Sequence, residues 1–432
     1  MELVRVALPF GRGHVVTDLP AAVTRVLAPQ PWPRTPMSEA DLVTLAIEQP
    51  VAGPPLCDLA RDASHLVVIT SDHTRALPSR ITLPPLLAEA RRHRPDLAIT
   101  LLVGTGLHRA PTVQEARERF GPDILVQCRL QVHDATSAQH LVDLGVLSTG
   151  TRLLVNRAVA EADLVVAEGL IEPHFFAGYS GGRKSVLPAT SGAESIYQNH
   201  RPRYIDHPCA RNGVLDGNPV HEESLEAARR ARLAFILNVV VSETRTIVAA
   251  VAGDLDAAHR AGVAVLAQHA VCPAHPAEIA LVSNAGYPLD RDLYQSVKGL
   301  AVAADAVVRG GTIILVAECC DGIGHADFFG LASRPAGPRA ILEAIRGGNA
   351  PARDAWQVQV LARVLEDARV IVVSRNLDPR DVRAMHMDWA PDLPAALAVA
   401  RVRYGSDGRI NVIPEGPATV IVPLEDSGAV LR

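Results

Sequence analysis

The segment from Glu172 to His200 combines a glycine-rich run, a lysine and two histidines in one short stretch. The glycines of the run GYSGGRK allow positive φ angles and let the backbone approach a ligand closely. Their amides, and a helix starting near Lys184, could hold an anion. A neutral imidazole such as that of His200 could ligate a borderline metal. These residue types predict a nucleotide-like cofactor that carries a metal.

Two features of this segment have more than one interpretation. The run around Lys184 is loosely similar to a P-loop, but the GxxxxGK[ST] spacing is absent, which argues against a simple nucleoside triphosphate site. The Lys184 amine could instead form a covalent link to an acyl group of a cofactor. His207 competes with His200 as a metal ligand, and both could also be ordinary surface residues.

Three predicted strands end in polar clusters. Runs of apolar and β-branched residues at 65–70, 98–103 and 163–169 read as buried strands of a mainly parallel sheet. The segments after them are Ser71-Asp72-His73-Thr74-Arg75, Gly104 to His108, and Gly169 to His174. A capping box at Thr112 and Glu115 predicts a helix after the second cluster. Ligands of open α/β sheets bind outside the carboxyl ends of the strands, so the clusters favour one shared site.

Individual residues in these clusters have a chemical and a structural interpretation. Asp72 could bind ribose hydroxyls, and Arg75 could form a forked pair with a carboxylate or phosphate, but an Asx turn with a solvated arginine would also fit. His108 could be a general base, or a histidine bonded to backbone at a helix entry. His174 precedes two phenylalanines and could be catalytic or simply packed on an aromatic loop.

The second half of the chain offers a further polar group. Tyr294, Gln295 and Lys298 share one face of a predicted helix and could bind a substrate carboxylate, although a solvated helix start has the same pattern. His325 and Asp327 lie in a polar loop with weaker claims. Trp356 and Gln357 begin another predicted helix and either line a cleft or pack in a core.

The order of predicted elements indicates two α/β domains with mostly parallel sheets. A chain of 432 residues exceeds one compact core. A proline-rich break near 272–276 separates an N-terminal cofactor-binding and catalytic domain, 1–272, from a smaller α/β domain, 275–405. A last predicted strand at 419–423 could return to either domain, so 406–432 could complete the first one.

The composition excludes several classes of protein. A net charge of −5 does not fit an electrostatic nucleic-acid binder, and no apolar run reaches the length of a membrane span. The start of the chain lacks the pattern of a signal peptide, and the six cysteines are scattered without a CxxC pair. We therefore expect a cytoplasmic protein with a small-molecule substrate, no nucleic-acid or membrane partner and no thiolate zinc site.

Taken together, these segments resemble the nickel-dependent lactate racemase family, whose members use a nickel-pincer nucleotide. The resemblance covers most of the chain, and its most specific part is the run from Glu172 to Pro188 with Asn199-His200. It implies two α/β domains with the active site in the cleft between them. One departure is Ala189, where the family pattern predicts glycine.

The resemblance also implies a role for each candidate residue. Lys184 would carry the cofactor, a nickel(II) pyridinium-3,5-bisthiocarboxylic acid mononucleotide, through a thioamide, and His200 rather than His207 would ligate nickel. His108 and His174 would be the acid/base pair. Nucleotide contacts would come from Ser71, Asp72, His73, Thr74 and Arg75. Substrate contacts would come from Arg75, Tyr294, Gln295 and Lys298. Cofactor-synthesis proteins are implied as partners.

The expected activity is that of an isomerase, a racemase or epimerase that inverts C2 of a 2-hydroxy acid, lactate or a larger analogue. Inversion by hydride transfer needs a base on each side of the substrate, because the two enantiomers present their hydroxyls oppositely. One alternative is an NAD-dependent 2-hydroxy acid dehydrogenase, although no strand runs into a GxGxxG motif followed by an acidic residue. The other alternative is a non-catalytic cofactor-binding homologue.

Overall fold

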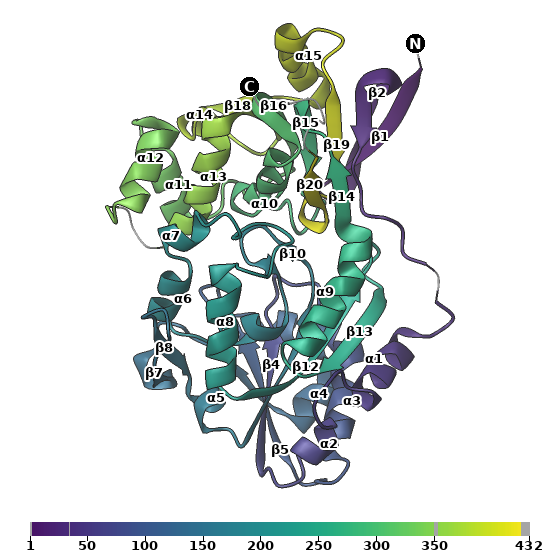
Figure 1. Cartoon of the computed structure of the whole chain (residues 1–432), viewed down its shortest axis with the longest axis vertical. Coiled ribbons are helices and arrows are strands. Elements are labelled where there is room, and N and C mark those ends of the chain that lie inside the picture. Colours follow the sequence, from purple (N-terminus) through teal and green to yellow (C-terminus); the bar gives the residue numbers. More distant parts are fainter. Residues whose placement is uncertain (1, 34, 350–352, 425–432) are drawn as a thin grey trace, which may run out of the picture. The chain divides into compact units, whose positions relative to one another are not determined.

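The chain forms two compact units, shown in the computed structural model that describes residues 2–33, 35–349 and 353–424 (Figure 1). The central unit consists of Pro31–Glu172 and Ala177–His269. The terminal unit consists of Met1–Gln30, Pro173–Phe176 and Ala270–Arg432, apart from the residues not described. Among the described residues, no helix is both long and apolar enough to cross a membrane.

The central unit is built on a six-stranded sheet. In spatial order its strands are β13 (Ile247–Gly253), β12 (Leu233–Val241), β9 (Leu164–Leu170), β4 (His65–Ser71), β5 (Ala98–Gly104) and β6 (Arg129–Val132). All neighbours pair in parallel except β12 and β13. A separate antiparallel pair is formed by β7 (Leu141–Val146) and β8 (Arg152–Asn156).

Side chains of the central strands alternate between two apolar cores because successive residues of a strand point to opposite faces. Leu66 and Val68 belong to one core, and Val67 and Ile69 belong to the other. The first core is covered by α1 (Glu39–Glu48), α2 (Leu56–Leu59), α3 (Ser79–Arg91) and α4 (Val113–Gln127), which Figure 1 shows gathered together. The second core is covered by α5 (Arg157–Glu161), α6 (Ala193–Asn199), α8 (Pro219–Arg230) and α9 (Ala257–Ala270).

The direction of strand addition in this sheet reverses between β4 and β9. From β4 the chain adds β5 and β6 on one side, and then β9 and β12 on the other. In open α/β folds, ligands bind at such a reversal, outside the carboxyl ends of the strands. Residues 71–75 and the glycine-rich segment follow these two strands directly.

The terminal unit contains a second six-stranded sheet, and all of its pairs are parallel. Its strands, in spatial order, are β18 (Asp388–Ala390), β17 (Ala368–Val373), β16 (Val307–Val316), β15 (Ala277–Ser283), β19 (Ile410–Ile413) and β3 (Thr24–Val26). Its helices are α10 (Leu293–Ala304), α11 (Ala326–Ala332), α12 (Gly337–Arg346), α13 (Ala355–Asp367), α14 (Pro379–Ala384) and α15 (Leu393–Tyr404). The hairpin of β1 (Leu3–Phe10) and β2 (Gly13–Pro20) adds Val6, Leu8 and Leu19 to its core.

The α/β class and the mainly parallel sheets are confirmed, whereas the domain boundaries differ from those expected from the sequence. Residues 1–30 group with the terminal unit, because β3 pairs with β19 in the second sheet. The segment 406–432, as far as Leu424, also belongs there: β20 (Val420–Pro423) pairs with β14 (Val271–Ala274). Residues 425–432 of that segment lie outside the described residues. The short strand β10 (Pro173–His174) is grouped with the terminal unit as well.

Candidate active site

The loop after β4 joins Asp72, Thr74 and His108 in one hydrogen-bonded group. Asp72 Oδ1 accepts from the Thr74 amide at 2.9 Å and from the Thr74 hydroxyl at 2.6 Å, and Asp72 Oδ2 lies 2.7 Å from His108 Nδ1. Burial alone would raise the pKa of Asp72, but the hydrogen bonds from His108 and Thr74 outweigh it and hold this pKa well below its usual range. The ionised carboxylate therefore fixes the proton of His108 on Nδ1, which leaves Nε2 as the basic nitrogen.

The residues of this loop have both a structural role in the turn and a possible chemical role. Asp72 does form the Asx turn that the sequence allowed, and it also orients a histidine, a contact that the sequence did not predict. Arg75 donates from its guanidinium to Glu172 at 3.0 Å, and both side chains are about one-third exposed or less. Burial lowers the pKa of His73. The loop thus presents cationic and neutral donors around one buried carboxylate.

Arg119 of α4 holds the backbone of this loop. The sequence alone did not identify this residue as part of the candidate site. Its guanidinium donates to the carbonyl of Ser71 at 2.9 Å and to the carbonyl of Arg75, the first and last residues of the predicted cluster. Burial lowers the pKa of Arg119, while the charges of Glu168 and Asp72 oppose that effect. In the sequence, Arg119 is one of several charged residues on an amphipathic helix, which gave no signal of this contact.

The glycine-rich segment is a tight turn whose close approaches exclude side chains. Gly178 has φ +76°, and a Cβ there would lie 2.1 Å from the carbonyl oxygen of Val214. Lys184 lies in the 3-10 helix Gly182–Ser185, and its amide donates to the Gly181 carbonyl at 3.2 Å. Arg183 is buried and donates to the carbonyls of Ala177 and Tyr179, so this cation is part of the scaffold of the turn.

His200 and Lys184 both belong to the central unit, and their charges interact. His200 ends α6 and is 8% exposed. Burial, and then the positive charge of Lys184, lower the pKa of His200 to about 3, so its imidazole is neutral at physiological pH. A neutral buried imidazole is a suitable ligand for nickel, and the donor set fits the predicted metal. His207 is exposed, and its Nδ1 accepts from the amide of Cys209 at 3.2 Å.

Ala189, the departure from the family pattern, occupies an ordinary backbone conformation. It is absent from the positive-φ residues among the part of the chain that the structure describes. Its Cβ is the atom closest to Gly104, where an added Cβ would lie 2.9 Å away. The Gly106 amide donates to the Ala189 carbonyl at 2.9 Å. Glycine is therefore needed at 104 rather than at 189 in this chain.

The predicted substrate-binding residues of the terminal unit lie at the start of α10. The Asp292 side chain caps this helix by accepting from the Gln295 amide at 2.7 Å. Lys298 Nζ donates to Gln295 Oε1 at 2.7 Å, so the two side chains share one face of the helix as predicted. An ammonium group beside an amide is a suitable pair of donors for a carboxylate.

Tyr294 is buried among aromatic and acidic side chains of the same unit. Its ring is 4.4 Å from the His325 ring and 5.3 Å from the Phe328 ring. His325 Nδ1 lies 2.9 Å from Asp354, and this hydrogen bond raises the pKa of His325. Burial, and then the charge of Asp354, raise the pKa of Tyr294 well above its usual value. Gln357 donates to the Tyr294 carbonyl at 2.6 Å, so it packs rather than faces solvent.

His174 stands among aromatic rings of the terminal unit. Its ring stacks on Phe175 at 5.0 Å and meets the edge of Phe176 at 4.6 Å. The candidates are therefore divided between the two units. The central unit holds Ser71, Asp72, His73, Thr74, Arg75, His108, Lys184 and His200, and the terminal unit holds His174, Tyr294, Gln295 and Lys298. The structure unites Asp72 with His108, and Gln295 with Lys298, by direct hydrogen bonds.

Two α/β units, each with polar residues at the carboxyl ends of parallel strands, define an enzyme-like α/β protein. Comparison with known protein families identifies the family to which the chain belongs. Residues 10–213 match the lactate racemase N-terminal domain, and residues 272–422 match the lactate racemase C-terminal domain. The chain belongs to the lactate racemase family, which confirms the resemblance found in the sequence. Racemases are isomerases, and the chain is an enzyme of this class.

Two relatives support this assignment along almost the whole chain. A lactate racemase of Thermoanaerobacterium thermosaccharolyticum is 41% identical over 423 residues, which is 97% of this chain and 99% of the relative. A lactate racemase of Lactiplantibacillus plantarum is 39% identical over 389 residues, which is 89% of this chain and 91% of the relative.

Solved structures agree with these sequence comparisons. The lactate racemase apoprotein from T. thermosaccharolyticum superposes with a TM-score of 0.93, covering 97% of this chain and 100% of that chain at 41% identity. A Thermotoga maritima protein of known crystal structure, 16% identical, has a TM-score of 0.65 over 89% of this chain and 97% of that chain, which shows a shared fold.

Proposed function

We propose that this enzyme interconverts the enantiomers of a 2-hydroxy acid, with lactate, the substrate named for its relatives, as the first candidate. Support comes from family membership over nearly the whole length and from two relatives named as lactate racemases. These relatives favour racemisation over the dehydrogenase alternative. The observation that carries the proposal is the buried position of His200 in the same unit as Lys184, where burial, and then the charge of Lys184, lower its pKa and keep the imidazole neutral.

The cofactor we propose is a nickel-pincer nucleotide, attached to Lys184 and ligated by His200, with Ser71–Arg75 holding the nucleotide. The donor chemistry fits, since His200 is neutral and lies within the electrostatic reach of the Lys184 amine. When bound, this group would supply a hydride acceptor for C2 of the substrate.

The protein's own residues would manage the hydroxyl proton and the carboxylate. Asp72 holds the proton of His108 on Nδ1, so Nε2 can take the hydroxyl proton from one enantiomer. We propose His174 as the second base, for the enantiomer with the opposite configuration. Arg75, Tyr294, Gln295 and Lys298 would bind the carboxylate while the rest of the substrate turns. General acid/base help of this kind is typically worth about 10²–10⁴-fold.

The test is a panel of chiral 2-hydroxy acids, incubated with enzyme produced alongside proteins that synthesise the cofactor. We expect racemisation of one or more acids, about one nickel per chain, and additional mass on the peptide that contains Lys184. Enzyme that carries neither nickel nor additional mass and inverts no acid would refute the proposal. Nickel-loaded enzyme that is inert toward the panel would favour the non-catalytic alternative.

A C2-deuterated substrate tests the route of inversion. Hydride transfer predicts a primary isotope effect and retention of the label at C2 during turnover in ordinary water. Rapid loss of the label to solvent would instead indicate removal of a proton from C2.

A further inference from the structure

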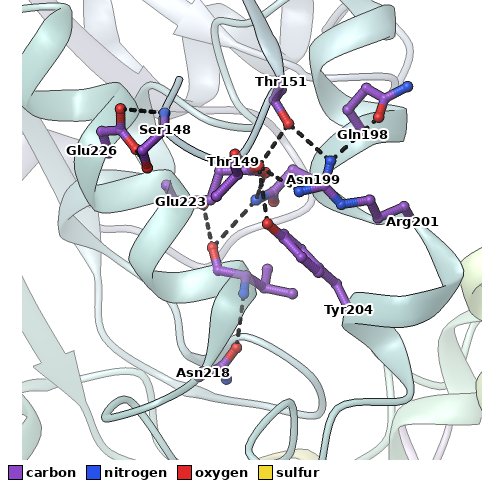
Figure 2. A network of polar contacts seen from close by, with 12 residues as sticks. Ser148, Thr149, Thr151, Gln198, Asn199, Arg201, Tyr204, Asn218, Glu223 and Glu226 are labelled. Carbon is purple, nitrogen blue, oxygen red and sulfur yellow. Dashed lines mark hydrogen bonds and ion pairs between the residues drawn. The ribbon is translucent and has the colours of Figure 1, made fainter. Parts of the chain in front are cut away.

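We propose that Glu223 is a positioning residue that fixes the backbone on both sides of His200. This inference rests on the proposed role of His200 as the nickel ligand. Glu223 lies on α8 and has a fully buried side chain. Figure 2 shows its carboxylate at the centre of a polar network that joins α8, the loop 148–151 and the segment that follows α6.

The carboxylate of Glu223 receives hydrogen bonds from both neighbours of His200. Oε2 accepts from the Asn199 side-chain amide at 2.8 Å, and Oε1 accepts from the Arg201 guanidinium at 3.0 Å (Figure 2). Asn199 is itself buried and also donates to the Val220 carbonyl at 3.3 Å. The residues immediately before and after His200 are thus tied to the same side chain, which limits rotation of the backbone between them.

Further contacts extend this attachment to the next helix. The Tyr204 hydroxyl of α7 (Pro202–Ile205) donates to Glu223 Oε1 at 3.3 Å, and the Arg201 guanidinium lies over the Tyr204 ring at 3.9 Å. Thr151 donates to the same oxygen at 2.6 Å, and Thr149 also donates to it. Five donors therefore surround one carboxylate in the interior, and together they determine where the turn between α6 and α7 lies.

A charged acceptor is required for this arrangement. Every partner of the carboxylate is a donor, and Arg201 brings a positive charge that is only 13% exposed. Breaking a buried ion pair by removing one partner leaves the other charge uncompensated. Glutamine at 223 would keep the shape, but its amide would face a donor and could not balance Arg201. We therefore expect Glu223→Gln to loosen the turn that carries His200.

The same helix offers a matched control. Glu226 lies three residues further on and accepts from the amide of Ser148 at 2.8 Å and from the Ser148 hydroxyl (Figure 2). It holds the same loop as Glu223, and its contacts with Ser148 and Arg230 lie outside residues 199–204. Glu226→Gln therefore removes one charge from α8 without touching the turn at His200.

A second variant separates the proposed effect from general loss of folding. Asn199→Leu removes the donor that precedes His200 but retains the ion pair between Glu223 and Arg201. This variant is expected to fold even where Glu223→Gln does not. Because Lys184 belongs to a different segment, both variants should keep the covalently attached mass.

The experiment has two readouts on full-length protein. In apo-protein, amide hydrogen exchange of the segment 196–206 should become at least tenfold faster in Glu223→Gln and Asn199→Leu, with Glu226→Gln within twofold of wild type. In protein loaded with cofactor, a chelator should remove nickel at least tenfold faster from the first two variants, and their nickel absorption bands should shift, while intact mass still shows the attached group.

Exchange and nickel release within twofold of wild type in both Glu223→Gln and Asn199→Leu would overturn the inference. It would also be overturned if exchange accelerated equally in β4 and β5, since that pattern indicates general unfolding. If wild-type protein binds no nickel, the proposed function fails, and the exchange of 196–206 in apo-protein still decides whether Glu223 fixes this turn.

Discussion

At the scale of single residues, the contact between Asp72 and His108 is the clearest case of one side chain setting the chemistry of another. The ionised carboxylate directs the imidazole proton to Nδ1. In Asp72→Asn the amide would present either a donor or a weaker acceptor to that nitrogen, which disfavours the tautomer with a basic Nε2.

We expect Asp72→Asn to lower the racemisation rate by about 10²–10⁴-fold, the typical worth of one acid/base group, with cofactor still attached. Chiral chromatography gives the rate and intact mass gives the loading. A variant that loses activity only in proportion to its loss of attached cofactor would contradict this prediction, because Asp72 would then act on the nucleotide alone.

His221 of α8 provides a prediction about pH. Its side chain is buried, and neither ring nitrogen hydrogen-bonds to a described residue. Burial, and then the charge of Arg183, lower the pKa of His221 to about 3, against about 6.5 in an unfolded chain. Between these values the unfolded chain binds a proton that the folded protein does not. The contribution of His221 to stability is therefore fully present above about pH 6.5 and falls by about 1.4 kcal/mol for each pH unit between about 6.5 and 3.

His221→Leu should remove this contribution without exposing a polar group. We expect the loss of unfolding free energy between pH 7.5 and pH 5.0 to be about 2 kcal/mol smaller in the variant than in wild type. Urea unfolding at the two pH values measures the difference. An identical pH dependence in both proteins would show that His221 does not remain neutral in the folded state.

At the scale of elements, Glu168 ties three segments of the central unit together. It lies in β9 and accepts from Thr70 of β4 at 2.5 Å, and from Ser79 and Thr82 of α3 at 2.7 and 2.5 Å. Burial raises the pKa of Glu168, and the three hydroxyls only partly oppose that effect. These contacts fix where β4 ends, and therefore where residues 71–75 begin.

We expect Glu168→Leu to lower the free energy of unfolding by about 3 kcal/mol, because three buried hydroxyls lose their acceptor. Glu168→Gln retains one acceptor oxygen, so its free energy of unfolding should fall by only about 1 kcal/mol. Denaturant unfolding of apo-protein compares the two. Equal losses in both variants would mean that shape, rather than hydrogen bonding, decides the role of this residue.

Local patterns in the sequence were enough to predict the elements that carry the candidates. The apolar runs predicted β4, β5 and β9, and the capping box predicted the start of α4. Helix α3 spans Ser79–Arg91 and accommodates Pro84 and Pro85 in its interior, where proline is usually disfavoured.

Contacts between distant segments could not be predicted in this way. Arg119 and Glu223 are charged residues on amphipathic helices, a pattern typical of a solvated face, and only the packed structure reveals their buried partners. The choice between His200 and His207 as a metal ligand could not be made from the sequence for the same reason. Only the folded structure shows that His200 is buried near the charge of Lys184, whereas His207 is exposed. Roles at the site follow from the family resemblance and remain predictions.

At the scale of the whole molecule, the two ends of the chain contribute to one unit. The parallel pair of β3 and β19 brings together segments at opposite ends of the sequence, and sequence order alone left open which domain the second of these segments joins. In addition, the hairpin β1–β2 covers part of the second sheet, where the side chains of Leu8, Ile279 and Leu281 are all fully buried. The terminal unit should therefore depend on the first 30 residues, and the central unit should not.

Leu8→Ala tests this dependence, with Val16→Ala on the same hairpin as the control. Leu8 is fully buried, so truncation should lower the stability of the terminal unit by about 2–5 kcal/mol, whereas Val16 is 49% exposed and its truncation should cost little. Amide hydrogen exchange reports the two units separately. We expect Leu8→Ala to accelerate exchange in β15 and β16 while β4 and β5 of the central unit keep their wild-type rates. Equal acceleration in both sheets would show that the two units unfold as one, in which case the division between them would be architectural but not energetic.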